Sequence, residues 1–229
     1  LDTPHPIAYV LDHHKPSIDS VFIHASAPPD NLSVFTSLDC PCYSLSPSLF
    51  NSLTTAAHQG GAILVVQAPE SPPFIPDHYS SLMICDGIQH AHNLGTIIRS
   101  ASAFGVDGIL ITDQTVYPYH RDAIRASTGY AFSIPVWRLT PTILQQLCDA
   151  SFPFFAADVH ASQPIHSLQF SSKKVVIFGS EAHGICCPDL DPIRDHIQSF
   201  YIPMADHVDS LNVGVSAGIT LFYLQHMVK

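Results

Sequence analysis

The chain has 229 residues, 46% of them hydrophobic, which is enough apolar material for one large domain or two smaller ones. Nine Lys and Arg residues stand against nineteen Asp and Glu, and the formal net charge is −10. This charge excludes a broad electrostatic grip on nucleic acid, because phosphates are bound mainly through Lys and Arg. The longest apolar stretch, 211–224, is interrupted by Asn212 and falls short of the roughly 20 residues of a membrane span, so we expect a soluble protein with no membrane contact.

The first 67 residues predict a small α/β domain. Runs typical of strands occur at 7–11, 20–24 and 62–67, and 46–58 has the composition of a helix capped near Ser46. The following stretch, 68–80, contains four prolines, which can neither donate to a sheet nor continue a helix. We interpret it as a linker to a second domain, 81–229.

Strands and helices alternate over 81–229, which is typical of a parallel sheet covered on both faces. The predicted strands are 81–85, 107–112, 134–139, 154–159, 174–179 and 199–204. The predicted helices are 93–104, 120–128, 141–151 and a last one from about 211. Because open α/β sheets bind ligands at the carboxyl ends of their strands, the loops after 81–85, 174–179 and 199–204 are the candidate sites.

The first candidate loop leads into "HAHNLGTIIRSASAFG", 90–105, where a cation stands among small and apolar residues. In a helix that begins near Asn93, Arg99 should lean back over the bare backbone of Gly95. This predicts a notch with a guanidinium at its floor, beside helix N–H groups that favour an anion. The alternative is that Arg99 pairs with an acid at the surface.

The second and third loops also carry polar residues at strand ends. In "FGSEAHG", 178–184, Gly179 permits close approach to the main chain, and Glu181 has no evident core role. In "YIPMADHVDSLNVGVSAG", 201–218, Ser210 suits an N-cap and Asn212 stands among apolar neighbours. A solvated turn and a capped, buried terminal helix are the structural alternatives.

Two other chemistries are disfavoured by spacing. Ser180 lacks the second glycine of a GxSxG nucleophile elbow, so a serine hydrolase is not expected. The six cysteines lie mostly in or beside apolar runs and are expected to be free thiols. Neither 40–42 nor 186–187 has the CxxC spacing of a tetrahedral zinc site, so no metal is expected.

Taken in order, the three loops resemble the signature motifs of the SpoU (TrmH-like) branch of the SPOUT methyltransferases, which methylate a ribose 2′-oxygen of RNA. The resemblance runs over 82–224, and the N-terminal part, including "AAHQGG" at 56–61, resembles the family's small ribosomal-protein-like substrate-binding domain. It implies a parallel α/β fold with a deep trefoil knot and a homodimer packed across the knots. The implied partner is RNA, with ribosomal RNA ahead of transfer RNA, and the location cytoplasmic, or organellar in a eukaryote.

The resemblance also implies roles for particular residues. S-adenosylmethionine would be held in a bent pose, mainly by main-chain groups, at Gly179, Ile202, Met204, Leu211 and Val213. The absence of a GxGxxG stretch fits this mode of binding. Arg99 would lie at the substrate ribose, Asn93 and Glu181 would position the nucleotide or Arg99, and Ser210 with Asn212 would complete the pocket, without a metal. The cations expected to grip RNA phosphates are Arg121 and Arg125.

The chain departs from the family pattern at several positions. His90-Ala91 stands where Asp-Pro is usual, Ala182 replaces a glycine, and Asp206 replaces another glycine and should place a negative charge near the cofactor. Gly214 and Ser216 stand where Ser and Ala are more typical. The acidic balance and Asp206 leave open a second hypothesis, a catalytically weak RNA-binding or scaffold protein on the same fold.

Overall fold

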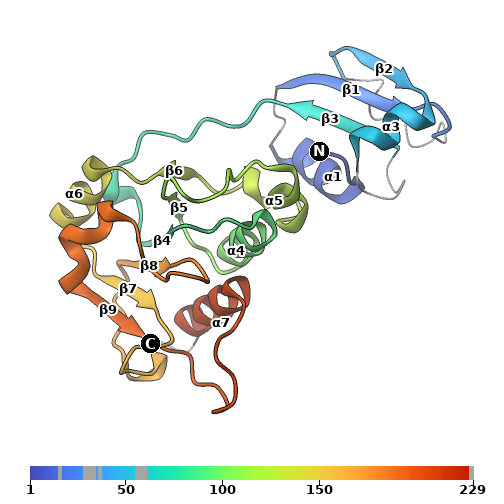
Figure 1. Ribbon diagram of the computed structural model, residues 1–229. Helices are drawn as coiled ribbons and strands as arrows, with labels where there is room; N and C mark the ends of the chain where they lie inside the picture. The colour runs from blue at the N-terminus through green and yellow to red at the C-terminus, as the bar shows by residue number, and fades with distance from the viewer. Residues whose placement is uncertain (15–16, 28–34, 36–37, 55–60, 227–229) are drawn as a thin grey trace. The chain divides into compact units, whose positions relative to one another are not determined.

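The computed structural model describes residues 1–14, 17–27, 35, 38–54 and 61–226 (Figure 1). The chain divides into two units, Leu1–Glu70 and Ser71–Lys229. The division falls inside the stretch 68–80. Residues 55–60, which hold the end of the predicted helix 46–58 and most of "AAHQGG", lie outside the described residues.

The N-terminal unit is built on a three-stranded sheet with the order β2-β1-β3. β1 runs parallel to β2 and antiparallel to β3. A core that includes Val21, Ile23 and Leu64 packs on one side of this sheet. The elements of this unit are α1 (Pro4–His13), β1 (Ile18–His24), β2 (Cys42–Leu45), α3 (Pro47–Leu53) and β3 (Ala62–Val66).

The predicted strand at 7–11 is wrong, because these residues lie in α1. Pro4 occupies the first helical turn, where its fixed φ favours a helix and its missing N–H is not needed. Ile7 and Val10, almost one turn apart, are both buried on the same face. A short apolar run does not distinguish a strand from a buried helix.

The C-terminal unit is built on a six-stranded sheet, within the described residues 71–226, in the order β6-β5-β4-β8-β7-β9. Every pairing in it is parallel, which confirms the predicted sheet. The last strand is displaced from the predicted 199–204 and ends at Phe200. The strands are β4 (Ser81–Cys85), β5 (Gly108–Ile111), β6 (Val136–Arg138), β7 (Phe154–Ala157), β8 (Lys174–Phe178) and β9 (Ile197–Phe200).

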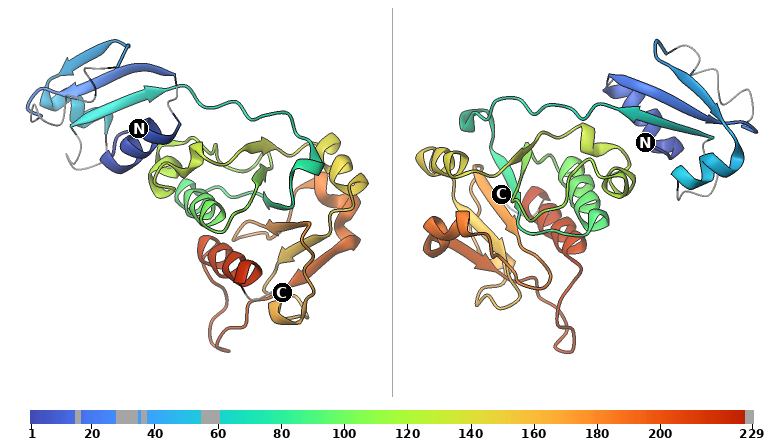
Figure 2. Two further views of the ribbon diagram at one scale, coloured as in Figure 1. Left: turned by 180° about the vertical axis from the view of Figure 1, so that it is seen from behind. Right: turned by 45° about the horizontal axis from the view of Figure 1, so that its top comes forward.

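Helices cover both faces of this sheet (Figures 1 and 2). Met83 and Cys85 of β4 belong to the apolar cluster shared with α4 and α7, whereas Leu82 and Ile84 belong to the cluster shared with α6. This alternation explains why β4 is apolar from Leu82 to Cys85. The helices are α4 (Ala91–Ala103), α5 (Arg121–Ala126), α6 (Pro141–Asp149) and α7 (Val213–His226), with 3₁₀ helices at Pro76–His78, Tyr130–Phe132, Ile165–Ser167 and Pro188–His196.

Two of the helices that border the candidate loops begin at unexpected residues. α4 begins at Ala91, two residues before Asn93. α7 is capped by Asn212 and not by Ser210, because Asn212 Oδ1 accepts from the N–H groups of Gly214 at 2.9 Å and Val215 at 3.4 Å. Asn and Ser are comparable N-caps, so composition did not decide between them. In the described part of the chain, no helix combines the length and apolarity needed to cross a membrane.

Candidate active site

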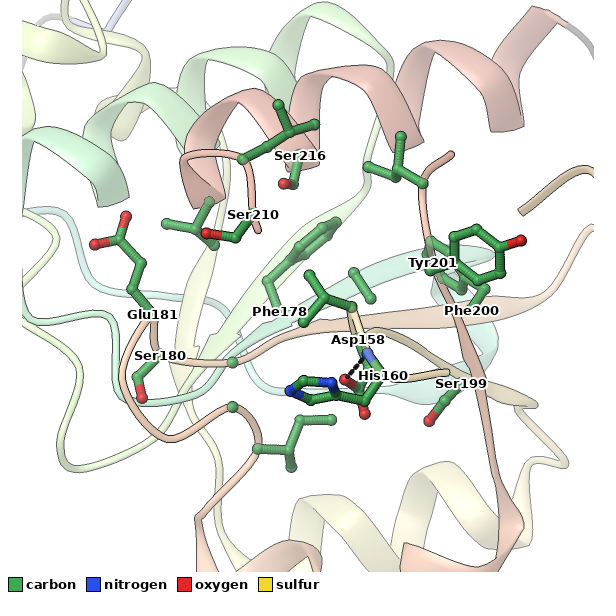
Figure 3. A pocket seen from close by; sticks show the side chains of 18 of the residues that line it. Asp158, His160, Phe178, Ser180, Glu181, Ser199, Phe200, Tyr201, Ser210 and Ser216 are labelled. Carbon is green, nitrogen blue, oxygen red and sulfur yellow. Dashed lines mark hydrogen bonds between the residues drawn. The ribbon is translucent and has the colours of Figure 1, made fainter. Parts of the chain in front are cut away.

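A cavity of about 520 Å³ lies at the carboxyl ends of β7, β8 and β9 (Figure 3). Its walls are the loop after β8, the segments after β7 and β9, and the start of α7. Figure 3 shows Glu181 on one wall, Ser210 and Ser216 on another, and Asp158 with His160 on a third. All five residues predicted to hold a cofactor line this cavity, namely Gly179, Ile202, Met204, Leu211 and Val213.

The loop after β8 folds into a tight hairpin, 179–187. The N–H of Ser180 donates to Gly184 O and the N–H of Gly184 donates to Ser180 O, both at 2.9 Å. Gly179 is required by the hairpin itself, because a Cβ there would lie 2.2 Å from the carbonyl carbon of Gly184. Sequence reasoning assigned Gly179 to ligand approach alone, and the structure adds this second constraint.

Three residues from the three candidate loops meet beside the cavity. Asn93 Nδ2 donates to Glu181 Oε1 at 2.9 Å, and Asn212 Nδ2 donates to Asn93 Oδ1 at 2.9 Å and to Glu181 Oε1 at 3.3 Å. Since Asn212 also caps α7, this triangle connects the start of α4, the hairpin and the start of α7. These hydrogen bonds account for a polar residue at position 212 among apolar neighbours in the sequence.

The predicted notch at Gly95 is absent from the described structure. Gly95 packs against α5, and a Cβ there would lie 2.4 Å from Ala123 O and 2.6 Å from Ala126 Cβ. The glycine therefore permits close helix packing instead of making room for Arg99. Arg99 is exposed on α4 and lines neither this cavity nor the smaller one that adjoins it. Among the described residues no acid pairs with it, so the surface ion pair is not observed either.

A second, smaller cavity of about 150 Å³ adjoins the first at the tip of the hairpin. The two cavities share Glu181 and Val213, and Asn93 lines only the smaller one. Ala182, where the family pattern has glycine, lines both. Asp206 is exposed and lines neither cavity, so the expected negative charge at the cofactor edge is not found there.

Sequence reasoning missed Asp86, the residue after β4. Its side chain is fully buried, and its carboxylate accepts hydrogen bonds from two N–H groups at the end of the hairpin. Burial, with the Asp86 charge as a second cause, raises the pKa of the neighbouring Cys85 thiol to about 12. An acid directly after the apolar run 82–85 was the available signal. All six cysteines are free thiols, and no group of three or more metal-binding side chains was found within the described residues.

The two arginines predicted to contact RNA lie on α5 and share one acid. Asp122 Oδ1 is 3.8 Å from Arg121 Nε and 3.5 Å from Arg125 Nη1. Three further cations of the described residues are also paired with acids, namely Arg138 with Asp113, Lys173 with Asp77 and Arg194 with Asp191. These pairs reduce the local positive charge available to phosphates.

Comparison with known proteins assigns the chain to a family. Residues 80–222 match the model of the SpoU rRNA Methylase family, and the chain belongs to that family. A TrmH-family tRNA/rRNA methyltransferase of Staphylococcus epidermidis is 31% identical over 184 residues, covering 76% of this chain and 73% of the relative. An uncharacterized tRNA/rRNA methyltransferase of Synechocystis is 28% identical over 79% of this chain, but the chain spans only 65% of that relative.

Solved structures share the fold. The SpoU methyltransferase AviRb of Streptomyces viridochromogenes, in complex with AdoMet, superposes with a TM-score of 0.82 at 22% identity, covering 97% of this chain and 87% of AviRb. An AdoMet-bound rRNA methyltransferase of Sinorhizobium meliloti gives a TM-score of 0.82 at 21% identity, covering 100% of this chain and 87% of that one. An RNA 2′-O ribose methyltransferase gives 0.79 at 23%, covering 98% and 87%.

Proposed function

We propose that the protein transfers a methyl group from S-adenosylmethionine to a ribose 2′-hydroxyl of RNA. One observation carries this proposal: the five residues at the family's cofactor positions line a single cavity, beside the triangle of Asn93, Glu181 and Asn212. The names of the relatives and the AdoMet-bound neighbours support the same activity. The position of Asp206 outside both cavities removes one of the two grounds for the scaffold hypothesis, and the acidic balance of the chain is the other.

The residues present fit the cofactor. A volume of about 520 Å³ is within the usual range for small-molecule sites. Ile202, Met204 and Leu211 offer apolar surface to an adenine ring, and the N–H groups of Leu211 and Val213 have no acceptor among the described residues. Such main-chain donors can recognise ring nitrogens and hydroxyls.

The protein's contribution to the reaction is mainly orientation. Bound S-adenosylmethionine supplies an electrophilic methyl group on its sulfonium. The smaller cavity, which Asn93 and Glu181 border, would receive the ribose, so that its 2′-oxygen faces the larger one. Such proximity can contribute roughly 7–11 kcal/mol. A guanidinium is a poor base at its usual pKa, so Arg99 would orient the ribose or an adjacent phosphate.

We also propose a homodimer formed through α7. This helix is apolar on all sides, yet Val215, Ile219 and Phe222 are 48%, 40% and 51% exposed. The spacing i, i+4, i+7 places these three side chains on one solvent-facing stripe of α7, the α7 stripe. A second copy supplies a matching apolar surface, as isologous interfaces require. The resemblance further implies that α7 threads a knot, and this remains part of the proposal.

The proposed dimer would explain why Arg99 lies outside the cavity of its own chain. Thr96 and Ser100 of α4 face Gly214 and Gly218 of α7, and Arg99 projects to solvent beside this contact. A copy seated on the α7 stripe would therefore also cover Arg99. We propose that each Arg99 serves the cavity of the partner subunit.

The N-terminal unit is proposed to bind the RNA substrate, with ribosomal RNA ahead of transfer RNA. Residues 1–70 contain one Lys and no Arg, against six acids, so this unit cannot rely on phosphate contacts. It offers instead an exposed Tyr43, stacked on Phe22 with ring centroids 5.5 Å apart. Unpaired bases stack on such rings.

Two measurements test the proposal. Calorimetric titration with S-adenosylmethionine should show saturable binding. Methyl transfer from labelled S-adenosylmethionine to ribosomal and transfer RNA from cells lacking the protein should then identify the RNA, and nuclease mapping should locate the label on a 2′-oxygen. Absence of cofactor binding would refute the activity, and a label on a base would refute the ribose assignment.

A further inference from the structure

One residue holds both ends of the hairpin 179–187. The N–H of Asp86 donates to Phe178 O, just before the hairpin, at 2.9 Å. Its Oδ2 accepts from the N–H groups of Cys186 at 2.7 Å and Cys187 at 3.0 Å, at the other end. Asp86 is not part of the hairpin, because it follows β4 directly in the chain. It therefore ties the hairpin to the central strand of the sheet.

The carboxylate is fully satisfied by groups from separate elements. Oδ1 accepts from Thr112 Oγ1, after β5, at 3.1 Å, and the side chain has no solvent exposure. Burying a carboxylate is costly unless hydrogen bonds to it compensate, and bonds to an ionised group are stronger than neutral ones. An apolar side chain would avoid the cost of burying a charge, but it would leave the N–H groups of Cys186 and Cys187 without their acceptor.

The hairpin has weaker support elsewhere. Arg194 Nη1 donates to Ile185 O at 3.3 Å, and Glu181 Oε1 accepts from Asn93 and Asn212, but these contacts are exposed. The bonds between Ser180 and Gly184 are internal to the hairpin and do not place it against the sheet. The bonds to the buried carboxylate of Asp86 therefore set where the hairpin lies.

We propose that Asp86 is a positioning residue for the cofactor cavity. By holding both hairpin ends, it places the main chain of Gly179 on the cavity wall and keeps Glu181 within hydrogen-bond reach of Asn93 and Asn212. This inference rests on the proposed function, because the effect is transmitted to S-adenosylmethionine. It assigns Asp86 no contact with the cofactor or the substrate.

The test compares Asp86→Asn with Ile84→Val. The amide keeps the shape of the carboxylate but removes its charge and one acceptor oxygen, whereas Ile84→Val trims a buried side chain of the same strand that faces α6. Calorimetric titration should show the dissociation constant for S-adenosylmethionine rising about ten-fold or more in Asp86→Asn. It should be unchanged in Ile84→Val, although both variants melt at lower temperature. Wild-type affinity in Asp86→Asn, or an equal loss in Ile84→Val, would overturn the inference.

A measurement on the unmodified protein is independent of variant folding and of the cofactor. Amide hydrogen exchange at Cys186 and Cys187 should be as slow as in β4, because both N–H groups donate to a buried acceptor. Rapid exchange at these two amides would overturn the inference. Failure of the wild-type protein to bind S-adenosylmethionine, with slow exchange retained, would instead refute the proposed function and, with it, the role in cofactor binding.

Discussion

Replacement of Gly179 by alanine tests the geometry of the hairpin. The added Cβ would lie 2.2 Å from the carbonyl carbon and 2.4 Å from the carbonyl oxygen of Gly184, so backbone has to move. The movement separates Ser180 from Gly184 and breaks two hydrogen bonds of 2.9 Å. At about 0.5–1.5 kcal/mol for each bond, Gly179→Ala should lower the free energy of unfolding by about 1–3 kcal/mol. For a chain of this size the melting temperature should fall by about 2–12 °C.

Calorimetry can measure both consequences of this substitution. Gly179→Ala should melt earlier and should bind S-adenosylmethionine at least about ten-fold more weakly, because Gly179 forms part of the cavity wall. Gly218→Ala is the matched control: its Cβ would meet only Ser100 Oγ, at 3.5 Å. Alanine within a helix favours folding by roughly 0.5–1 kcal/mol over glycine, so this control should keep its affinity and should melt no earlier than the wild type. Wild-type melting and affinity in Gly179→Ala would refute the reasoning.

Three further substitutions test separate parts of the molecule. Arg99→Ala should abolish methyl transfer but leave cofactor affinity unchanged, because the proposed contact of Arg99 is with the ribose or an adjacent phosphate and not with the cofactor; retained turnover would contradict its role. Phe222→Lys should convert the dimer to monomer in sedimentation experiments, whereas Tyr43→Lys, on the other unit, should not. Burial, with Tyr117 as a second cause, raises the pKa of Tyr119 to about 12, from about 10 when unfolded. The neutral phenol thus stabilises the fold below about pH 10, and this contribution is lost as the pH rises towards 12. Tyr119→Phe should remove that loss in urea unfolding at alkaline pH, and an unchanged pH dependence would contradict the assignment.

The parallel sheet could be predicted because its strands are buried on both faces. Such strands contain continuous apolar runs, as at 82–85 and 175–178, and helices separate them. The order of the strands could not be predicted, since hydrophobicity indicates that a strand is buried but not which strand lies beside it. The same ambiguity made α1 look like a strand, because five apolar-rich residues suit either structure.

The residues of the site were easier to predict than their directions. Asn93, Glu181 and Asn212 follow or precede strand ends at one edge of the sheet, and this rule brings them together without knowledge of the packing. The direction of Arg99 depends on α5, which fills the space over Gly95. Asp86 was missed because its partners are main-chain N–H groups 100 and 101 positions away, which no local pattern reveals.

The place of β4 in the sheet has a consequence during biosynthesis. β4 lies between β5, which the ribosome delivers next, and β8, which emerges only after β6, α6 and β7. Until then one edge of an apolar strand has no hydrogen-bonding partner. The Asp86 carboxylate also lacks the N–H donors of Cys186 and Cys187. The nascent chain therefore passes through a long stage in which this strand edge is unpaired and can pair with another chain. Protection by a chaperone at this stage should increase the yield of folded protein.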